Sequence, residues 1–399
     1  MVLKIRKEPW NIRLEAFLLA LYFALIPLEN VLVASMGGSI NKYIGILIIG
    51  IIIIKYLRNG KISIANYIPI MCFFAFSLAS YLWSIGAGNS YLNILINMTV
   101  CTLVFIQVPI RKSEQTLMLY AIVFAGVILA LMMLTGSRAT TINTISGGRM
   151  TLVFGGLMID NNNLAVSISI CAIVSFHLFY LSKEAASKAL WIVGFFLITL
   201  AIFYTGSRGG LLAEIIGLAL YIWKSGNGIR FRTILIVAVL ILLFSIIIQY
   251  FLSGGLAQRF SIFDVISSGG TGRTRIWGDA LRSYSNDNFL RQAFGYGFGT
   301  FGKTQGLFWG HYTASHNDFV GILIELGFVG LVLFIIVWIK LFQKTLIDQN
   351  WLAFSLLAVV FVGSLSLEML IKKMLWLVWY FALVKIQDVD SVRKEANLD

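Results

Sequence analysis

The residues of this chain that can do chemistry gather between positions 253 and 327, its one long stretch that is not mostly apolar. That stretch contains six cations and two of the three histidines, namely Arg259, Arg273, Arg275, Arg282, Arg291, Lys303, His311 and His316. A planar guanidinium binds phosphate oxygens through paired hydrogen bonds, and a neutral imidazole accepts a proton from an alcohol near pH 7. The stretch therefore combines phosphate-binding groups with a candidate base.

The elements that must position these groups are apolar. Hydrophobic residues make up 59% of the chain and charged residues 12%, with a mean hydropathy of +0.87, whereas soluble domains carry about 25% charged residues. Repeated apolar runs long enough to cross a hydrocarbon core of ~30 Å predict an all-α, polytopic integral membrane protein. An outer-membrane barrel would show shorter alternating segments. The net charge of +13 is explained by basic cytoplasmic loops, so we expect the lipid bilayer and no nucleic acid as a partner.

We predict about twelve transmembrane helices in a single membrane domain over residues 1–399. They are expected near 14–34, 42–57, 67–83, 91–109, 115–135, 164–181, 189–204, 210–223, 233–252, 318–341, 351–368 and 374–386. The first run has about 20 residues, which favours an uncleaved span over a signal peptide. Residues 253–317 form a large loop between the ninth and tenth spans, and we expect this loop to be catalytic.

The distribution of basic residues predicts the orientation. With a cytoplasmic N-terminus, most of the 31 Lys and Arg residues fall in cytoplasmic segments, as the positive-inside rule requires. Both termini are then cytoplasmic, the protein lies in the cytoplasmic (inner) membrane, and the loop 253–317 with the active site is extracytoplasmic. The cations of this loop stand on the side where the rule disfavours them, so an anionic partner is expected there.

Four arginines fall near helix ends on the predicted outer side, namely Arg149, Arg208, Arg273 and Arg275. Such a cluster suits a diphosphate whose lipid tail stays in the bilayer; the alternative is a set of surface cations. Arg208 lies in Thr-Gly-Ser-Arg-Gly-Gly (205–210), between two short spans. Glycines there permit a sharp turn, and a helix starting near Leu211 would place its positive end beside Arg208. The alternative is a tight external turn with one snorkelling arginine.

Two segments of the loop have a recognisable local pattern. Residues 273–281 predict an amphipathic helix at the membrane surface, with Arg273 and Trp277 on one face. The glycine-aromatic run at 294–299 has no Gly-Lys-Ser/Thr and is therefore no P-loop. We interpret that run as a close-packed loop.

Polar residues also stand where two predicted spans begin. His316 is either a base or a structural histidine, and Asn317 beside it suits a helix cap. The stretch 160–163 suits a cap or hydrogen bonding to sugar hydroxyls. Glu325, inside a span, is expected to pair within the bundle, with Arg208 or another cation as a candidate partner. The loop 253–317 has no Asp-x-Asp pair, and the sequence shows no His-Glu-x-x-His or Ser-His-Asp pattern, so we expect no metal and no cofactor.

Four motifs in this order resemble the O-antigen ligase and O-antigen polymerase superfamily. They are TGSRGG (205–210), GRTRIW (272–277), FGYGFG (294–299) and HNDFVGILIELGFVG (316–330). The resemblance covers residues 149–335 and extends further only by span count. It implies a GT-C-type membrane glycosyltransferase that takes a glycan from an undecaprenyl diphosphate carrier. The glycan passes to a second acceptor with inversion and without a metal.

The resemblance also implies roles for particular residues. The family's two arginines fall on Arg208 and Arg273, which would hold the diphosphate, and its histidine falls on His316, which would orient or deprotonate the acceptor hydroxyl. The family's asparagine falls on Asn163. Arg275 departs from the family pattern and is interpreted as an extra phosphate or acceptor contact. The predicted catalytic residues are thus His316, Arg208 and Arg273, and the predicted substrate-binding residues are Arg149, Asn163, Arg275, Trp277 and Asn317.

Three functions remain open at this point. A surface-polysaccharide polymerase adds repeat units from the lipid carrier to an acceptor glycan, and a chain-length regulator is then a candidate partner. A ligase moves the finished chain to lipid A core or another terminal acceptor. A transporter of the same lipid-linked glycans would show charges spread through the spans and internal repeats. We favour the polymerase, because nothing in the sequence marks a lipid A or protein acceptor.

Overall fold

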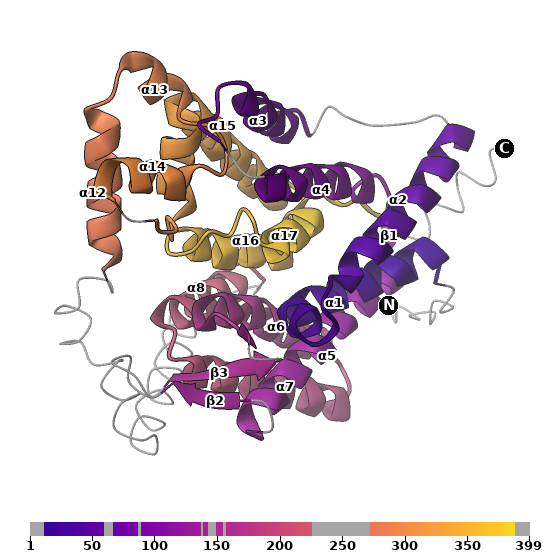
Figure 1. Ribbon diagram of the computed structural model, residues 1–399. Coiled ribbons are helices and arrows are strands. Elements are labelled where there is room, and N and C mark those ends of the chain that lie inside the picture. The colour runs from indigo at the N-terminus through magenta and orange to yellow at the C-terminus, as the bar shows by residue number, and fades with distance from the viewer. Residues whose placement is uncertain are drawn as a thin grey trace.

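The computed structural model describes residues 12–59, 67–86, 89–136, 139–142, 149–154, 157–225, 272–310 and 312–387. The predicted ninth span near 233–252, the loop cation Arg259 and the histidine His311 lie outside the described residues. In the part of the chain that is described, helices form most of the structure (Figure 1).

Each of the other predicted spans coincides with a helix. These are α1 (Leu14–Met36), α2 (Ile40–Asn59), α3 (Ile68–Ala79) with the 3-10 helix η2 (Ser80–Leu82), α4 (Asn89–Phe105), α5 (Lys112–Leu134), α6 (Asn161–Leu181), α7 (Ala185–Thr205), α8 (Arg208–Ser225), α15 (Asp318–Ile347), α16 (Trp351–Ser364) and α17 (Lys373–Leu383). Among the described residues, α1, α5, α6, α7 and α15 are long and apolar enough to cross a membrane. The helices are those of a polytopic membrane protein, and a total of twelve spans stays a prediction.

The all-α prediction omitted two small sheets. Between α5 and α6, the strands β2 (Ala139–Ile142), β3 (Arg149–Phe154) and β4 (Leu157–Met158) form an antiparallel sheet in that order, and β2 and β3 lie beside α7 in Figure 1. Strand β1 (Ile110–Arg111) pairs in parallel with β5 (Ile386–Gln387). Threonine and branched apolar residues in β2 and β3 favour strands, so the sequence did contain a local signal for this sheet.

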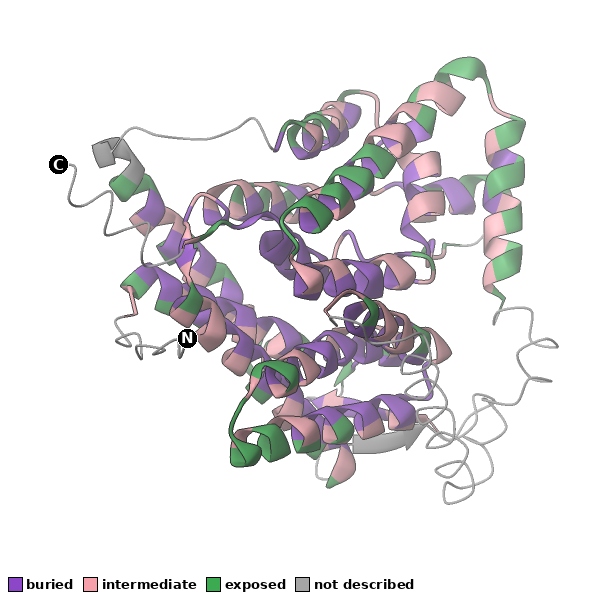
Figure 2. Ribbon diagram, turned by 180° about the vertical axis from the view of Figure 1, so that it is seen from behind, coloured by how far each residue is buried: buried purple, intermediate pink, exposed green. Residues whose placement is uncertain are grey.

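The core centres on α6, which packs against α5, α7, α8 and α16. Its residues are buried along most of their length, as the colouring of Figure 2 shows for the middle of the bundle. Glycines permit the close approach of its neighbours. A Cβ at Gly126 of α5 would lie 2.4 Å from Cys171, and one at Gly210 of α8 would lie 2.4 Å from Ala165. Small residues at such crossings are typical of membrane bundles.

The described half of the long loop folds into three short helices beside α15 (Figure 1). They are α12 (Arg273–Ser285), α13 (Phe289–Phe294) and α14 (Phe301–Trp309). The amphipathic helix predicted at 273–281 is therefore confirmed, and it extends to residue 285. Ala280 of α12 is fully buried and packs with Phe301 and Ile324.

A break in α15 holds the glycine-aromatic run in place. Gly327 has φ 65° and ψ −169°, which interrupts the helical hydrogen bonds before it. The carbonyls of Ile324 and Glu325 instead accept the N–H groups of Tyr296 (3.2 Å) and Gly297 (2.7 Å). Gly295 has φ +71°, and a Cβ there would lie 2.3 Å from the Glu325 carbonyl oxygen. The run is thus the close-packed loop that the sequence predicted.

The side chain of Glu325 has a different partner from the cation that was expected. Its Oε1 accepts the backbone N–H of Phe301 at 3.0 Å. Phe301 is the first residue of α14, so the carboxylate stabilises the positive end of that short helix. The expected pairing of Glu325 with a cation is replaced by this anchoring of the loop to α15.

Contacts sort the helix ends into two groups. One group, the charge-paired end, comprises residues 12–15, 55, 109–114, 180, 225 and 386–387, joined for example by Arg13 to Glu114 and by β1 to β5. The other, the site end, comprises residues 29–42, 83–86, 89–97, 149–154, 157–163, 205–210, 272–310, 312–318 and 365–373. Every segment of the site end is one that the sequence predicts to be extracytoplasmic or next to such a segment. The grouping is the one that alternating membrane crossings produce.

Candidate functional site

The turn between α7 and α8 places Arg208 at a helix start. Gly206 ends α7 in the left-handed conformation, with φ 63°. The Ser207 hydroxyl accepts the N–H of Gly210 at 3.2 Å and so caps α8. Helix α8 therefore begins at Arg208, three residues earlier than the sequence predicted. Arg208 is half-buried in the positive first turn of this helix, where its charge and the helix dipole both favour an anion.

Arg149 lies at the start of β3, not at a helix end as predicted. Its Nε donates to the Thr205 carbonyl oxygen at 2.9 Å, and its Nη2 donates to Oδ1 of Asn162 at 3.0 Å. Nδ2 of Asn161 donates to the same Thr205 carbonyl at 3.1 Å. These bonds tie β3 and the start of α6 to the α7–α8 turn, so Arg149 has a structural contact beside Arg208.

The start of α6 presents one asparagine to a cavity. Asp160 caps the helix, because its Oδ1 accepts the N–H of Asn163 at 2.8 Å. The side chain of Asn163 lines a cavity, and its buried Oδ1 has no hydrogen-bond partner among the described residues. Of the three consecutive asparagines, Asn163 is thus the one with an acceptor left for a ligand.

His316 is held in an unusual backbone conformation one residue before the cap of α15. Its φ is +47°, which is uncommon for a residue with a side chain and is found preferentially at functional sites. The preceding residue is fixed on two sides. The N–H and hydroxyl of Ser315 donate to Oε1 of Glu368 at 2.6 and 2.9 Å, and the Ser315 carbonyl accepts Nε1–H of Trp277 at 2.8 Å.

Asn317 is the helix cap that the sequence predicted. Its Oδ1 accepts the N–H groups of Phe319 (2.9 Å) and Val320 (3.1 Å), and its Nδ2 donates to the Leu365 carbonyl at 3.1 Å. Both ends of the amide are therefore engaged by the protein. The structure gives Asn317 a positioning role, and its predicted contact with substrate stays a prediction.

The charges around His316 come from segments far apart in the chain. Burial lowers the pKa of His316 below its ordinary 6.5, and the positive charge of Arg273 lowers it further, while Glu368 and Asp160 act in the opposite direction. Burial also lowers the pKa of Arg273, against the effect of Asp160, although a guanidinium stays charged at any physiological pH. His316 is therefore neutral near pH 7, with a half-buried cation in electrostatic contact.

The two arginines of the loop motif differ in their exposure to solvent. Arg273 is half-buried, whereas the side chain of Arg275 is 85% exposed and its Nε lies 3.8 Å from Asp279 on the next helical turn. Trp277 shares the inward face with Arg273, as predicted, and contacts Ser315. The structure thus separates a buried arginine at the site from a solvent-facing arginine beside it.

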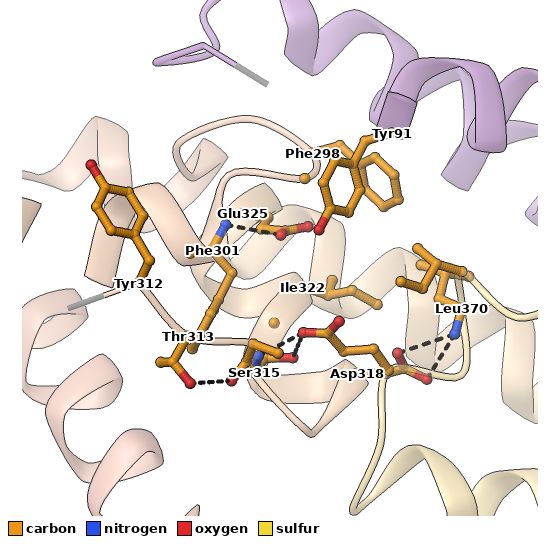
Figure 3. Close-up of a pocket in the computed structure, with 16 residues that line it drawn as sticks. Tyr91, Phe298, Phe301, Tyr312, Thr313, Ser315, Asp318, Ile322, Glu325 and Leu370 are labelled. Atoms are coloured by element: carbon orange, nitrogen blue, oxygen red, sulfur yellow. Dashed lines mark hydrogen bonds between the residues drawn. The ribbon is translucent and has the colours of Figure 1, made fainter. Parts of the chain in front are cut away.

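A cavity of about 310 Å³ opens beside the segment that carries His316. We call it the acidic cavity, because its lining includes Asp318, Glu325 and Glu368 together with Tyr91 and Tyr312. Figure 3 shows Asp318 bonded to the Leu370 N–H and Glu325 bonded to Phe301, with the two tyrosines on opposite sides. Carboxylates and aromatic rings can bind the hydroxyls and apolar faces of sugars.

Glu368 was missed by reasoning from the sequence. It stands at the edge of a predicted span beside Lys372 and Lys373, and nothing in its local pattern relates it to His316, 52 positions earlier. The general expectation that a carboxylate near a membrane span has a function is the one signal that pointed to it.

The comparisons with known proteins bear on the segment that forms this site. A family model described as O-antigen ligase matches residues 193–335. That range contains Arg208, α12 with Arg273, the glycine-aromatic loop and His316. A search of curated proteins finds no match to the chain. The apolar helices are those of an integral membrane protein, and its residues 193–335 are similar to the O-antigen ligase family.

Proposed function

We propose that the protein is a glycosyltransferase that lengthens a surface polysaccharide. It takes a glycan from an undecaprenyl diphosphate carrier at the extracytoplasmic face of the cytoplasmic membrane and joins it to an acceptor hydroxyl, inverting the anomeric carbon without a metal. The observation that carries the proposal is the hydrogen bond that joins two family motifs, in which Nε1–H of Trp277 donates to the carbonyl of Ser315, the residue before His316, at 2.8 Å. Arg273 lies in the same motif as Trp277, and its positive charge contributes to the lowered pKa of His316.

The arginines stabilise the leaving group in this proposal. When the glycosidic bond breaks, its electron pair and a negative charge pass to the diphosphate. Arg273 is half-buried, so its charge is less screened than that of a surface cation. Arg208 adds a guanidinium and the positive end of α8. Arg275 faces solvent and is assigned a weaker contact with the outer part of a phosphate or acceptor.

His316 is the base for the acceptor. Its imidazole takes the hydroxyl proton while the hydroxyl oxygen bonds to the anomeric carbon from the face opposite the diphosphate, which inverts the configuration. A bound diphosphate offsets the charge of Arg273, which is one cause of the lowered pKa of His316. Binding of the donor therefore raises the basicity of His316 at the moment when the proton must be taken.

One alternative function is that of a ligase, which would use the same residues with a different acceptor and donor. In that case the acceptor is lipid A core or another terminal acceptor, and the donor is a finished chain. A transporter of lipid-linked glycans is the remaining alternative, and charges spread through the spans and internal repeats would be expected for it. A chain-length regulator is a further proposed partner of the polymerase.

The test is transfer by the purified chain in detergent with EDTA, using a lipid diphosphate-linked repeat unit as the sole substrate. The parent is compared with His316→Asn, because asparagine tolerates the left-handed backbone of that position, and with Arg208→Ala. Lys188→Gln, at an exposed lysine in the first turn of α7, controls for loss of charge.

We expect a ladder of lengthened glycans for the parent and the control, and none for the two site variants. Transfer that requires added lipid A core would make the protein a ligase. Transfer that survives both site substitutions would refute the assignment of the site.

A further inference from the structure

A second and larger cavity lies at the site end. Its volume is about 630 Å³, and it is enclosed by the end of α1, the start of α2, α4, β4, the start of α6 and residues 371–373. Its charged and amide lining comprises three lysines, two carboxylates and several amide side chains, including Lys42, Lys372, Lys373, Glu29, Asp160, Asn41, Asn97 and Asn163. We call it the lysine cavity. No motif of the sequence analysis accounts for it apart from Asn163.

Two asparagines of this cavity have polar atoms that the protein does not satisfy. Asn41 is only 2% exposed, yet neither its Oδ1 nor its Nδ2 has a hydrogen-bond partner among the described residues. The buried Oδ1 of Asn163 is in the same condition. Burial of such groups without partners is costly, and each such group in a native structure requires an explanation. An amide that offers both a donor and an acceptor matches the hydroxyls of a sugar.

The charges of the cavity leave two lysines available. Lys373 forms an ion pair with Glu29 and donates to the Ser39 hydroxyl. Lys42 and Lys372 form no ion pair with any residue that the structure describes. These two cations therefore favour an anionic group in the cavity.

The lysine cavity adjoins the proposed reaction centre. Asp160 lines the cavity and also interacts electrostatically with both Arg273 and His316. Ile371 lines the lysine cavity and the acidic cavity alike, so the two lie on either side of one segment. A glycan at His316 can thus extend into the lysine cavity.

We propose that the lysine cavity binds a carboxylate-bearing sugar residue of the transferred glycan. Its carboxylate faces Lys42 and Lys372, and its hydroxyls bond to the amides of Asn41 and Asn163. The identification of the ligand as part of the glycan substrate rests on the proposed function, whereas the selectivity for an anionic, hydroxyl-rich ligand rests on the cavity itself.

Binding is measured on the full chain in detergent by the rise in its midpoint of thermal unfolding, since a ligand that binds the folded state raises it. The probe is a tetrasaccharide with one hexuronate, and its matched control is the same tetrasaccharide with a neutral hexose. The variants are Lys42→Gln with Lys372→Gln, the control Lys183→Gln with Lys188→Gln on exposed lysines elsewhere, and Asn41→Leu. Leucine keeps the size of Asn41 and removes an amide that has no partner, so this variant is expected to fold.

We expect the charged tetrasaccharide to stabilise the parent and the control variant, and added salt to weaken the effect. The affinity should fall at least tenfold in the Lys42/Lys372 variant and in Asn41→Leu. Equal stabilisation by the neutral tetrasaccharide, or an unchanged affinity in the Lys42/Lys372 variant, would overturn the proposal. Stabilisation by phosphatidylglycerol micelles but not by the uronate probe would also overturn it, in favour of a lipid headgroup.

The same binding measurement on His316→Asn separates this inference from the proposed function. Binding without transfer in this variant is the result that supports both. A parent that transfers glycan but does not select the charged probe would refute the inference alone. A parent that selects the probe but never transfers glycan would refute the proposed function alone.

Discussion

The two ends of the helix bundle treat their polar groups in opposite ways. At the charge-paired end, the buried carboxylate of Glu114 accepts Nε and Nη2 of Arg13 at 2.8 and 2.6 Å, and Lys55 pairs with Glu15. At the site end, the described structure leaves Asn41 without partners and Lys42 and Lys372 without counter-ions. The polar groups named at the charge-paired end form hydrogen bonds and ion pairs within the protein, while those named at the site end remain available for ligands.

The same criterion sorts the residues within the site end. The amide of Asn317, two nitrogens of Arg149 and Oε1 of Glu368 form hydrogen bonds with the protein, so these groups position other residues. Asn163 retains a buried acceptor that faces a cavity. The backbone of His316 is held by the contacts of its neighbours, and its imidazole experiences the positive charge of Arg273 and the negative charges of Glu368 and Asp160. The comparison thus separates residues for stability from residues for chemistry, and each prediction below tests that separation.

The largest effect is expected for His316→Asn. Because general-base catalysis contributes about 10²–10⁴-fold in rate, kcat should fall by that factor, while the midpoint of thermal unfolding stays close to that of the parent. Transfer assays and thermal unfolding of the same preparation measure both quantities. A large loss of stability with normal turnover would show that His316 contributes to stability and not to catalysis.

The next effect is expected at the opposite end, for Arg13→Ala. The substitution leaves the buried Glu114 carboxylate without its charged partner, which costs about 3–5 kcal/mol of unfolding free energy. Turnover per folded molecule should be unchanged, because Arg13 lies at the charge-paired end. Denaturant titration in detergent measures the unfolding free energy, and active-site counting measures the turnover per folded molecule. A loss of turnover without a loss of stability would contradict the assignment of Arg13 to a structural role.

Glu368 allows a sharper test of positioning. Glu368→Ala removes the anchor of Ser315 and, because small displacements near a reacting group are costly, should lower kcat by about 10–100-fold. Glu368→Gln retains an acceptor oxygen and should restore most of kcat. A glutamine variant as impaired as the alanine variant would show that the charge of Glu368 matters more than its hydrogen bonds.

The smallest effect is a shift in pH dependence. In the parent, kcat/KM reports the free enzyme, so its acid limb should lie below the ordinary imidazole pKa of 6.5. The activity falls as the pH drops through the lowered pKa, because His316 then becomes protonated. The acid limb of kcat should lie at higher pH than that of kcat/KM, because the bound diphosphate offsets Arg273.

The variant Arg273→Gln completes this test. Loss of the cation should raise the pKa of His316, move the acid limb of kcat/KM upward and reduce its separation from the limb of kcat. Full pH profiles of residual transfer measure the shift. Identical limbs in the parent and the variant would show that Arg273 does not act on His316.

Local patterns in the sequence predicted much of this structure. Apolar runs located the helices, the alternation of faces located α12, and Asn317 at the start of a span indicated a cap. The sheet at 139–158 was missed because its strands are short and stand apart from the apolar runs that dominate the chain. The start of α8 was predicted near Leu211, three residues late, because Gly210 was assigned to the turn, whereas Gly210 lies in the helix and packs against Ala165.

The sequence by itself determined the class of protein, its helices and the motifs that resemble the O-antigen ligase family, because hydrophobicity and helix capping depend on residues close together in the chain. Only the tertiary structure decided that Glu368 anchors the segment of His316, that Arg273 is half-buried while Arg275 faces solvent, and that Asn41 and Lys372 share a cavity. Hydrogen bonding, burial and electrostatic fields depend on distances in space, and these residues are brought together by packing between helices distant in sequence.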